Sequence, residues 1–346
     1  MDATLINLPT TAARLSIRSM IALLVILLIG GVAAAGGQEL ASDAASTDIE
    51  SDSARYAACA SHSGSFGGDI WELSTRHIGC VNGSTSGWLD RIQVSRWSGS
   101  DWKSSSITEA LYQSTESVVP PRTIVYVHGN WMERDNARER ARFIDSHIAR
   151  RAIEPYRLVM LSWPSEKNAP VIQDIRGNAR LADANATIGL ELLQALDESP
   201  TQVSILGFSL GARTVTGALN LKAMSPNAQK RYRVSLMAPA VDRDWLQPYG
   251  KEPFALSTVD SMVNLYNSND PVLKRFRFID RDARPIAAGF LGFERLSYTR
   301  STNPLTTNPL IRQYDCGRTI GTTHQERSYY SECSCTIIAI DNLLGK

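Results

Sequence analysis

The sequence predicts an α/β fold with a mostly parallel central sheet and helices on both of its faces. Short apolar runs typical of buried strands recur along the chain, and helical patterns lie between most of them. Strands that alternate with helices build parallel sheets that are covered on both sides. The length of 346 residues and the hydrophobic share of 43% fit one large folded domain or two of ordinary size, and they exclude a chain that is disordered throughout.

The expected strands start with two runs at 69–78 and 89–97, which a turn-rich segment separates. Six more apolar runs follow, at 123–127, 157–163, 202–206, 233–237, 262–266 and 311–314. Helical patterns occupy 137–151, 181–196 and 210–221. The less regular segment 271–309 predicts one helix followed by a long loop, and its basic stretch is typical of a solvated helix face.

The N-terminus has the pattern of a targeting segment. Arg14 and Arg18 precede an apolar run at 20–32, and three alanines ending at Ala35 follow. A positive region, an apolar region and a small-residue cleavage site define a secretory signal peptide. We therefore expect residues 1–35 to be a signal peptide and the protein to be exported, either to the periplasm or as a secreted protein. The alternative is an uncleaved segment that tethers the protein to a membrane.

Composition sets limits on the rest of the chain. Residues 36–66 are rich in Gly, Ala, Ser and Asp without an apolar period, which predicts a disordered or linker arm before a folded domain at 67–346. Lys plus Arg (36) nearly equals Asp plus Glu (35), and no basic block is present, which argues against a nucleic-acid partner. The chain contains no CxxC, HExxH or GxGxxG, so we expect neither a metal nor a cofactor.

Five cysteines lie beyond the expected signal peptide. In an oxidising compartment they can form disulfides, and the odd number leaves at least one free or paired between chains. Proximity in sequence suggests Cys59 with Cys80, and Cys316 with Cys333 or Cys335. Several free buried thiols are an equally good interpretation.

The segment GFSLG at 207–211 carries the main catalytic pattern. The strand expected at 202–206 leads directly into it, and a helix follows. This is G-x-S-x-G between strand and helix, the context in which a sharp turn exposes a nucleophilic serine, here Ser209. Such a turn is called a nucleophile elbow, and here the elbow comprises residues 207–211. The helix N-terminus behind it leaves backbone N–H groups unpaired, which suits a developing oxyanion. The alternative is a glycine-rich turn with an incidental serine.

A second strand end predicts the rest of an oxyanion hole. The run at 123–127 leads into His128-Gly129-Asn130-Trp131, upstream of the elbow. The amide of Asn130 or Trp131, beside that of Leu210, would bind the oxyanion. We expect His128 to brace this loop, although a catalytic base is the alternative.

The base and the acid are expected further along the chain. Triads built on this elbow run in the order Ser, Asp or Glu, His, and His324 is the only histidine after Ser209. Asp270 follows the strand expected at 262–266 on a turn stiffened by a proline, and it is the preferred acid. The alternative acid is Asp242, and the remaining candidates include Asp244 and Asp280.

Several segments together resemble the α/β-hydrolase superfamily, and more closely a group of uncharacterised bacterial α/β hydrolases. They are VHGN at 127–130, LSWPS at 161–165, GFSLGAR at 207–213, MAPAVDRDW at 237–245, LYNSNDPVLKR at 265–275 and GTTHQE at 321–326. The resemblance covers about residues 67–330. It implies Ser209 as nucleophile, His324 as base and Asp270 as acid. The HGN replaces the HGGG of lipases and esterases, which weakens any transfer of their specificity.

The function expected from these residues is hydrolysis of a carboxylic ester through an acyl-serine intermediate. The apolar Phe208, Leu210 and Trp131 favour a small-molecule or lipid-like acyl substrate. The same triad could serve a peptidase or an acyltransferase. A non-catalytic binding module with this fold is the remaining alternative, because fold does not fix function.

Overall fold

The computed structural model describes residues 67–78, 87–112, 120–226, 230–279, 284–294 and 310–346. The chain divides into two units, Met1–Gly64 and Ser65–Lys346, and only residues of the second are described here. The expected signal peptide and arm, as well as Cys59 and Cys80, lie outside the described residues. Within the described residues, no helix has the length and apolar character needed to cross a membrane.

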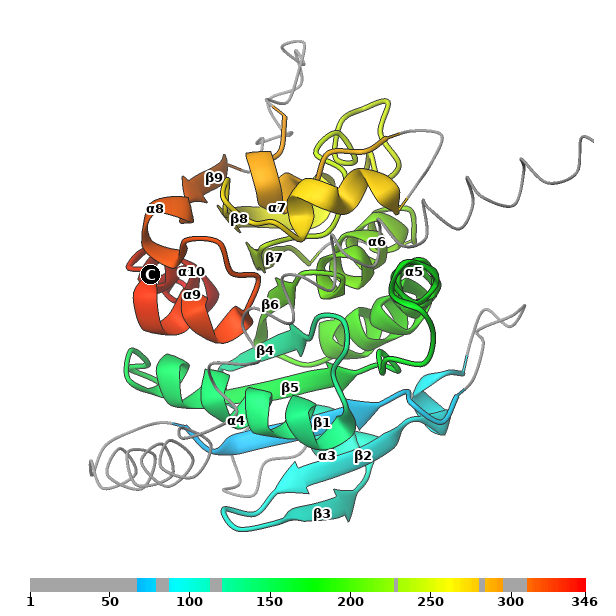
Figure 1. Ribbon diagram of the computed structural model, residues 1–346. Coiled ribbons are helices and arrows are strands. Elements are labelled where there is room, and N and C mark those ends of the chain that lie inside the picture. Colours follow the sequence, from blue (N-terminus) through cyan, green and yellow to red (C-terminus); the bar gives the residue numbers. More distant parts are fainter. Residues whose placement is uncertain (1–66, 79–86, 113–119, 227–229, 280–283, 295–309) are drawn as a thin grey trace, which may run out of the picture. The chain divides into compact units, whose positions relative to one another are not determined.

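The described part of the chain builds one nine-stranded sheet in the order β3-β2-β1-β5-β4-β6-β7-β8-β9 (Figure 1). Neighbouring strands are parallel except at β2, which is antiparallel to β1 and β3. This confirms the predicted mostly parallel sheet. The strands are β1 (Asp69–Ser74), β2 (Gln93–Trp97), β3 (Trp102–Ser105), β4 (Arg122–Val127), β5 (Tyr156–Ser162), β6 (Gln202–Phe208), β7 (Tyr232–Met237), β8 (Val259–Tyr266) and β9 (Leu310–Asp315).

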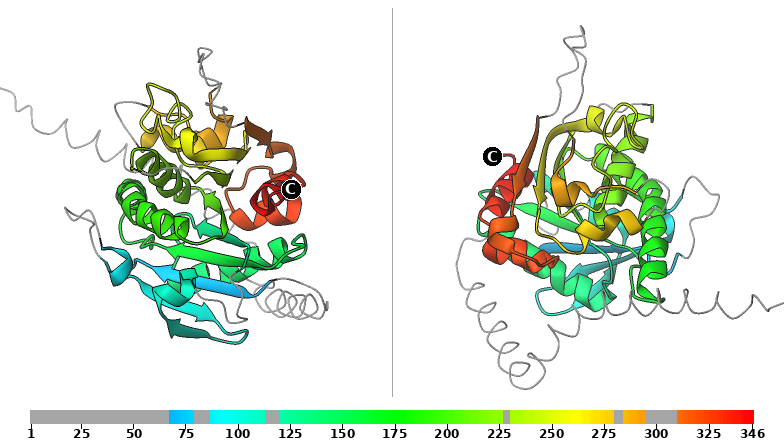
Figure 2. Two further views of the ribbon diagram at one scale, coloured as in Figure 1. Left: turned by 180° about the vertical axis from the view of Figure 1, so that it is seen from behind. Right: turned by 45° about the horizontal axis from the view of Figure 1, so that its top comes forward.

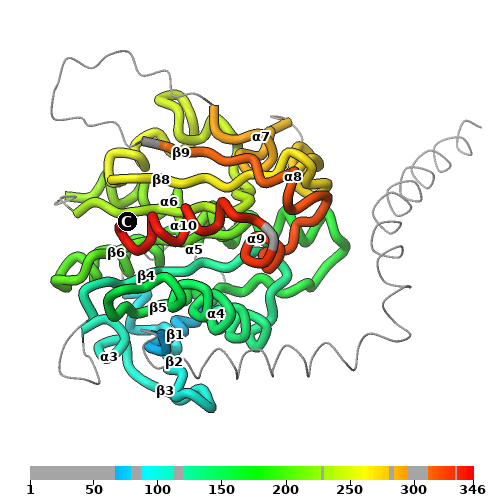
Figure 3. Tube along the Cα trace, turned by 90° about the vertical axis from the view of Figure 1, so that its left-hand side faces the viewer, coloured from blue at the N-terminus to red at the C-terminus, as the bar shows by residue number. Residues whose placement is uncertain are grey.

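Helices cover both faces of this sheet. α4 and α10 pack on one face and lie in front of the strands in Figure 3, whereas α5 and α6 pack against each other on the opposite face (Figure 2). The α-helices are α3 (Ile107–Tyr112), α4 (Arg134–Ala149), α5 (Val171–Asp197), α6 (Gly211–Ala223), α7 (Ala288–Leu291), α8 (Gly317–Ile320), α9 (Glu326–Glu332) and α10 (Cys335–Leu344). The 3-10 helices are η1 (Leu89–Arg91), η2 (Ala255–Thr258) and η3 (Leu273–Phe278).

The central strands are buried along their whole length, since helices cover both of their faces. Every residue of β4 and β5 is buried, which explains why their sequences read as continuous apolar runs rather than alternating ones. The charged exceptions are Arg122 at the start of β4 and Arg157 in β5, and Arg157 is only 1% exposed. Its guanidinium binds the Asp69 carboxylate at 2.7 Å and the Ala110 carbonyl at 2.7 Å, so the buried charge is paired.

The structure corrects the expected element between residues 89 and 97. Residues 89–91 form the 3-10 helix η1, and the strand β2 begins only at Gln93. The amides of Trp88 and Leu89 donate to the Glu191 carboxylate on α5 at 2.8 and 3.2 Å. This partner lies more than 100 residues away, so local apolar periodicity could not predict the turn.

The helix expected at 181–196 also begins earlier, at Val171. The amides of Asn168 and Ala169 donate to the Asp174 carboxylate, which ties the chain before α5 to its first turn. The segment 271–309 was expected to hold one helix followed by a long loop, and its described residues contain two short helices, η3 and α7. β3, α3, α8, α9 and α10 were not predicted.

Candidate active site

Ser209 lies at a strained turn between β6 and α6. Its φ is 50°, in the left-handed region that non-glycine residues rarely adopt. The Ser209 amide donates to the Met237 carbonyl at 3.0 Å, and its own carbonyl accepts from the amides of Ala212 and Ala240. Three backbone hydrogen bonds therefore hold the residue in this conformation, as expected where strain persists at a site.

The glycine after Ser209 allows α6 to approach the neighbouring strand closely. A Cβ on Gly211 would lie 2.3 Å from the Val127 carbonyl oxygen and 2.5 Å from that of His128. Backbone atoms cannot move aside as a flexible side chain can. Gly129 plays a similar part, because a Cβ there would lie 3.2 Å from the Ser209 Cβ and 2.7 Å from the Phe208 ring. Gly129 and Gly211 therefore let the loop after β4 pack closely against the turn that carries Ser209.

A hydrogen-bonded series leads from Ser209 into the protein. Ser209 Oγ lies 2.9 Å from His324 Nε2, and His324 Nδ1 lies 2.6 Å from Asp270 Oδ2. Asp270 is fully buried, and its Oδ1 accepts from the amides of Val272 and Leu273 at 2.8 and 3.0 Å. The backbone thus fixes one carboxylate oxygen while the other faces the imidazole. This is the geometry of nucleophile, base and orienting acid.

Asp242 is turned toward a different part of the chain. Its Oδ1 accepts from the Ile286 amide at 3.2 Å, and its backbone bridges to Ala287. Burial raises its pKa above the usual value. Among the described residues, Asp270 is the carboxylate that contacts His324. Asp280 lies outside the described residues.

The loop that carries His324 is held by an asparagine that the sequence analysis did not single out. Asn267 is fully buried, and its Nδ2 donates to the carbonyls of Gly321 and Thr323 at 2.9 and 3.2 Å. The Phe208 ring packs against the imidazole, with centroids 5.4 Å apart. The only hint in the sequence is that Asn267 lies three positions before Asp270 on the same turn.

Glu326 is a second residue that the sequence analysis missed. It lies two positions after His324, at the start of α9, and is 2% exposed. Its Oε2 accepts from Tyr126 Oη and from Arg140 Nη1, both at 2.9 Å. Burial raises its pKa, and the Arg140 charge opposes this. Glu326 therefore anchors the segment after His324 to β4 and α4.

Three backbone amides are available beside Ser209. Among the described residues, the amides of Leu210, Asn130 and Trp131 donate to no acceptor. Leu210 is the N-cap of α6, and Trp131 has a φ of 54°. The Asn130 side chain accepts from Asn178 Nδ2 at 2.8 Å, which fixes the loop from α5. These are the donors that the sequence predicts for an oxyanion hole.

His128 is hydrogen-bonded within the loop that follows β4. Its Nδ1 lies 2.9 Å from the Gly129 carbonyl, and its Nε2 accepts from the Trp163 amide at 3.2 Å. Burial, followed by the Arg76 charge, lowers its pKa to about 3, so the imidazole is neutral. Trp163 Nε1 also donates to the His128 carbonyl at 2.8 Å. Both ring nitrogens bind the loop and its neighbours, which fits the bracing role.

One group of potential metal ligands occurs in the part of the chain that the structure describes. It consists of Cys316, Cys333 and Cys335, whose sulfurs lie within 4.8 Å of one another. All three are free thiols. The series from Ser209 to Asp270 is not part of this group.

Comparison with known proteins adds one structural similarity. The chain is similar to MGS-M1, an α/β hydrolase enzyme from a Medee basin deep-sea metagenome library, with 12% identity and a TM-score of 0.30. The match covers 81% of this chain and 99% of that chain. No protein-family model and no curated protein matches the sequence. The fold class therefore rests on the topology of the sheet, and membership of the bacterial hydrolase group stays a prediction.

Proposed function

We propose that this chain is a serine hydrolase of the α/β-hydrolase type that cleaves a carboxylic ester. The observation that carries the proposal is the series Ser209–His324–Asp270, with distances of 2.9 and 2.6 Å between its polar atoms. Its members follow three different strands, β6, β8 and β9, at the same edge of the sheet. Incidental hydrogen bonds seldom join a strained serine, an imidazole and a buried carboxylate in one line.

In the first step, Ser209 Oγ attacks the ester carbonyl carbon while its proton passes to His324 Nε2. The Asp270 carboxylate holds Nδ1–H and stabilises the imidazolium that forms. His324 then gives the proton to the leaving alkoxide, and the acyl group remains on Ser209. In the second half, His324 takes a proton from water, and the resulting hydroxide attacks the acyl carbon. The bond to Ser209 Oγ then breaks, and His324 returns the proton to Oγ as the acid leaves.

The negative oxygen of each tetrahedral intermediate would bind the amides of Leu210 and of Asn130 or Trp131. These N–H groups have no competing acceptor in the described residues. Because the backbone fixes their direction, they need little reorganisation as charge develops. A donor of this kind contributes about 3 kcal/mol to transition-state stabilisation.

Burial separates the apolar residues around Ser209 into two kinds. Phe208 and Leu210 are 6% and 2% exposed and belong to the core, whereas Trp131 is 42% exposed. The Trp131 indole is held by its N–H, which donates to Asp174, and lies beneath Lys167 Nζ. Of these three residues, Trp131 is the one with a large exposed apolar surface. We propose that an apolar acyl or alkyl group of a small-molecule or lipid-like substrate binds there.

The proposed location follows from the N-terminal pattern alone. A signal peptide at 1–35 would place the enzyme in the periplasm or outside the cell, and an uncleaved segment would tether it to a membrane. The mass of the protein recovered from its native host distinguishes these forms. Loss of residues 1–35 is the expected result.

The activity is tested with p-nitrophenyl esters of increasing acyl length. The wild type should hydrolyse at least one of them, while Ser209→Ala and His324→Ala should each lose about 10⁴-fold or more in kcat. Hydrolysis by wild type that survives Ser209→Ala would contradict the assignment. A folded wild type that hydrolyses peptides but no ester would favour a peptidase, and one that hydrolyses neither would favour the binding module.

A further inference from the structure

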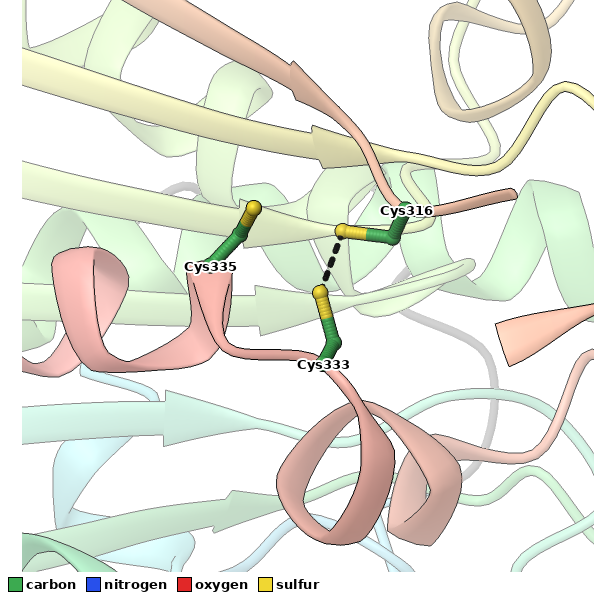
Figure 4. A group of neighbouring side chains, drawn as sticks. All are labelled: Cys316, Cys333 and Cys335. Atoms are coloured by element: carbon green, nitrogen blue, oxygen red, sulfur yellow. Dashed lines mark hydrogen bonds between the residues drawn. The ribbon is translucent and has the colours of Figure 1, made fainter. Parts of the chain in front are cut away.

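Three cysteine sulfurs meet where the segment carrying His324 begins and ends (Figure 4). Cys316 directly follows β9 and caps α8, Cys333 is the C-cap of α9, and Cys335 is the first residue of α10. The residues between the first two, 317–332, contain α8, His324 and α9. Cys316 and Cys333 are thus the two ends of one stretch of chain that supplies the proposed base.

The sulfur atoms of Cys316 and Cys333 lie 2.8 Å apart, and both side chains are buried at 1% and 5% exposure. Two zinc-bound thiolates at about 2.3 Å from the metal and at tetrahedral angles would lie about 3.8 Å apart. A structural zinc site also needs four ligands, and no fourth Cys, His, Asp or Glu joins the group among the described residues. The pair therefore fits a covalent bond between sulfurs better than a metal.

We propose that Cys316 and Cys333 form a reversible disulfide that clamps both ends of segment 317–332 and so controls how firmly His324 is held against Ser209. The consequence for Ser209 rests on the proposed hydrolase function, whereas formation of the disulfide does not. The predicted export supports an oxidised state, since disulfides persist outside the cytosol.

The oxidation needs an acceptor, which would be a low-molecular-weight disulfide such as oxidised glutathione. The Cys333 thiolate attacks one sulfur of that disulfide and releases its other half as a thiolate. Cys316 then loses its proton and attacks the Cys333 sulfur, which releases the second half. One protein disulfide and two small thiols result, so two electrons have passed to the acceptor. The hydrogen bond between the two sulfurs favours this order, because it lowers the pKa of Cys333 to about 6 and raises that of Cys316.

The clamp would act on a segment whose middle is held by side chains of other elements. Asn267 Nδ2 donates to the carbonyls of Gly321 and Thr323, and the Glu326 carboxylate accepts from Tyr126 and Arg140. Its first residue is held by Asn269 Nδ2, which donates to the Gly317 carbonyl at 2.9 Å. A covalent bond between the ends limits how far the middle can depart from Ser209 when one of these contacts opens.

The test uses the full chain in reduced and oxidised glutathione buffers, with free thiols alkylated before a non-reducing digest. Mass spectrometry should find Cys316 linked to Cys333 in the oxidised wild type. Cys335→Ser is the matched control, and it should form the same link. Cys316→Ser and Cys333→Ser should form none.

Two further measurements report how the disulfide affects segment 317–332 and Ser209. Proteolysis within 317–332 should be several-fold slower in the oxidised wild type, and fluorophosphonate labelling of Ser209 should be several-fold faster. In Cys333→Ser, neither rate should differ between the buffers. The proteolysis rate separates the two proposals, because protection without any labelling in either buffer would support the clamp and contradict the hydrolase function.

Three results would overturn the proposal. The first is oxidised protein without a link between Cys316 and Cys333. The second is a link that changes neither the proteolysis rate nor the labelling rate. The third is one zinc ion per chain that protects the three thiols from alkylation.

Discussion

The nucleophile and the base of the proposed triad are held in opposite ways. Ser209 is fixed locally, since it sits at the end of β6 with a φ of 50° and three backbone hydrogen bonds. His324 lies 115 residues away in a segment between α8 and α9, and buried side chains hold that segment. The asparagine Asn267 and the carboxylate of Glu326 supply the main contacts.

This difference predicts different responses to substitution. A larger side chain at the elbow would overlap backbone atoms that cannot move aside, so such a substitution should lower the free energy of unfolding. A change in the His324 segment removes a side-chain contact, so the fold should survive while the imidazole loses its position. The two regions can therefore be separated by measuring stability and catalysis on the same variants.

The largest expected effect is on kcat, from substitution of Asp270, the carboxylate that orients His324 toward Ser209. Asp270→Asn should lower kcat for ester hydrolysis by about 10⁴-fold, because the amide cannot hold His324 in the tautomer that accepts the serine proton. The control Asp242→Asn should change kcat less than threefold, since Asp242 faces the Ile286 amide. Stopped-flow or steady-state hydrolysis measures both. Equal losses in the two variants would contradict the assignment of the acid.

The elbow itself should be sensitive in stability. Gly211→Ala should lower the free energy of unfolding by about 3 kcal/mol, because the new Cβ would overlap the carbonyl oxygens of Val127 and His128. Gly177→Ala in α5 is the control, with nothing within 4 Å of its Cβ, and it should be neutral or stabilising by up to about 1 kcal/mol. Urea unfolding gives both values. A Gly211→Ala protein as stable as wild type would show that the elbow is not rigid.

Behind the elbow, α6 packs against a buried carboxyl group that makes stability depend on pH. Burial raises the pKa of Glu252 to about 7, while the hydrogen bond from Thr216 opposes the rise. The native state therefore keeps a proton that the unfolded state releases above pH 4.5, so stability present at low pH is lost as pH rises toward 7. In wild type, the free energy of unfolding should therefore fall by about 2 kcal/mol between pH 5 and pH 7.5 because of this group, and Glu252→Gln should abolish that fall. Unfolding by urea at pH 5 and pH 7.5 would show a smaller difference for the variant than for wild type.

The smallest expected effect is in the support of the His324 segment. Asn267→Ala should lower kcat about tenfold with little change in KM, because the carbonyls of Gly321 and Thr323 lose their donor. Ser268→Ala is the neighbouring control, since its hydroxyl binds Asp315 instead, and it should stay within twofold of wild type. If Asn267→Ala reduced stability but left kcat unchanged, the residue would be structural only.

The same contrast explains what the sequence could predict. The elbow is a contiguous pattern, so GFSLG and the strand before it indicate both the turn and the residue at its apex. The parallel sheet was predictable for a similar reason, because buried central strands such as β4 and β5 are continuous apolar runs.

The remaining features depend on partners that are distant in sequence. Glu191 binds the amides of η1 across about 100 residues, and Asn267 reaches the His324 loop across more than 50. Neither contact leaves a periodic pattern. The sequence also places Asp270 and Asp242 in equivalent positions after neighbouring strands, and only the folded chain shows which carboxylate faces the imidazole.

The central claim is that Ser209 is an activated nucleophile, and the most direct test is to locate a fluorophosphonate adduct by peptide mass spectrometry. The protein should gain one phosphonyl group on the peptide that contains Ser209, and His324→Ala should slow the reaction by about 10³-fold or more. An adduct on another serine, or a folded wild-type protein that gains no adduct, would contradict the account.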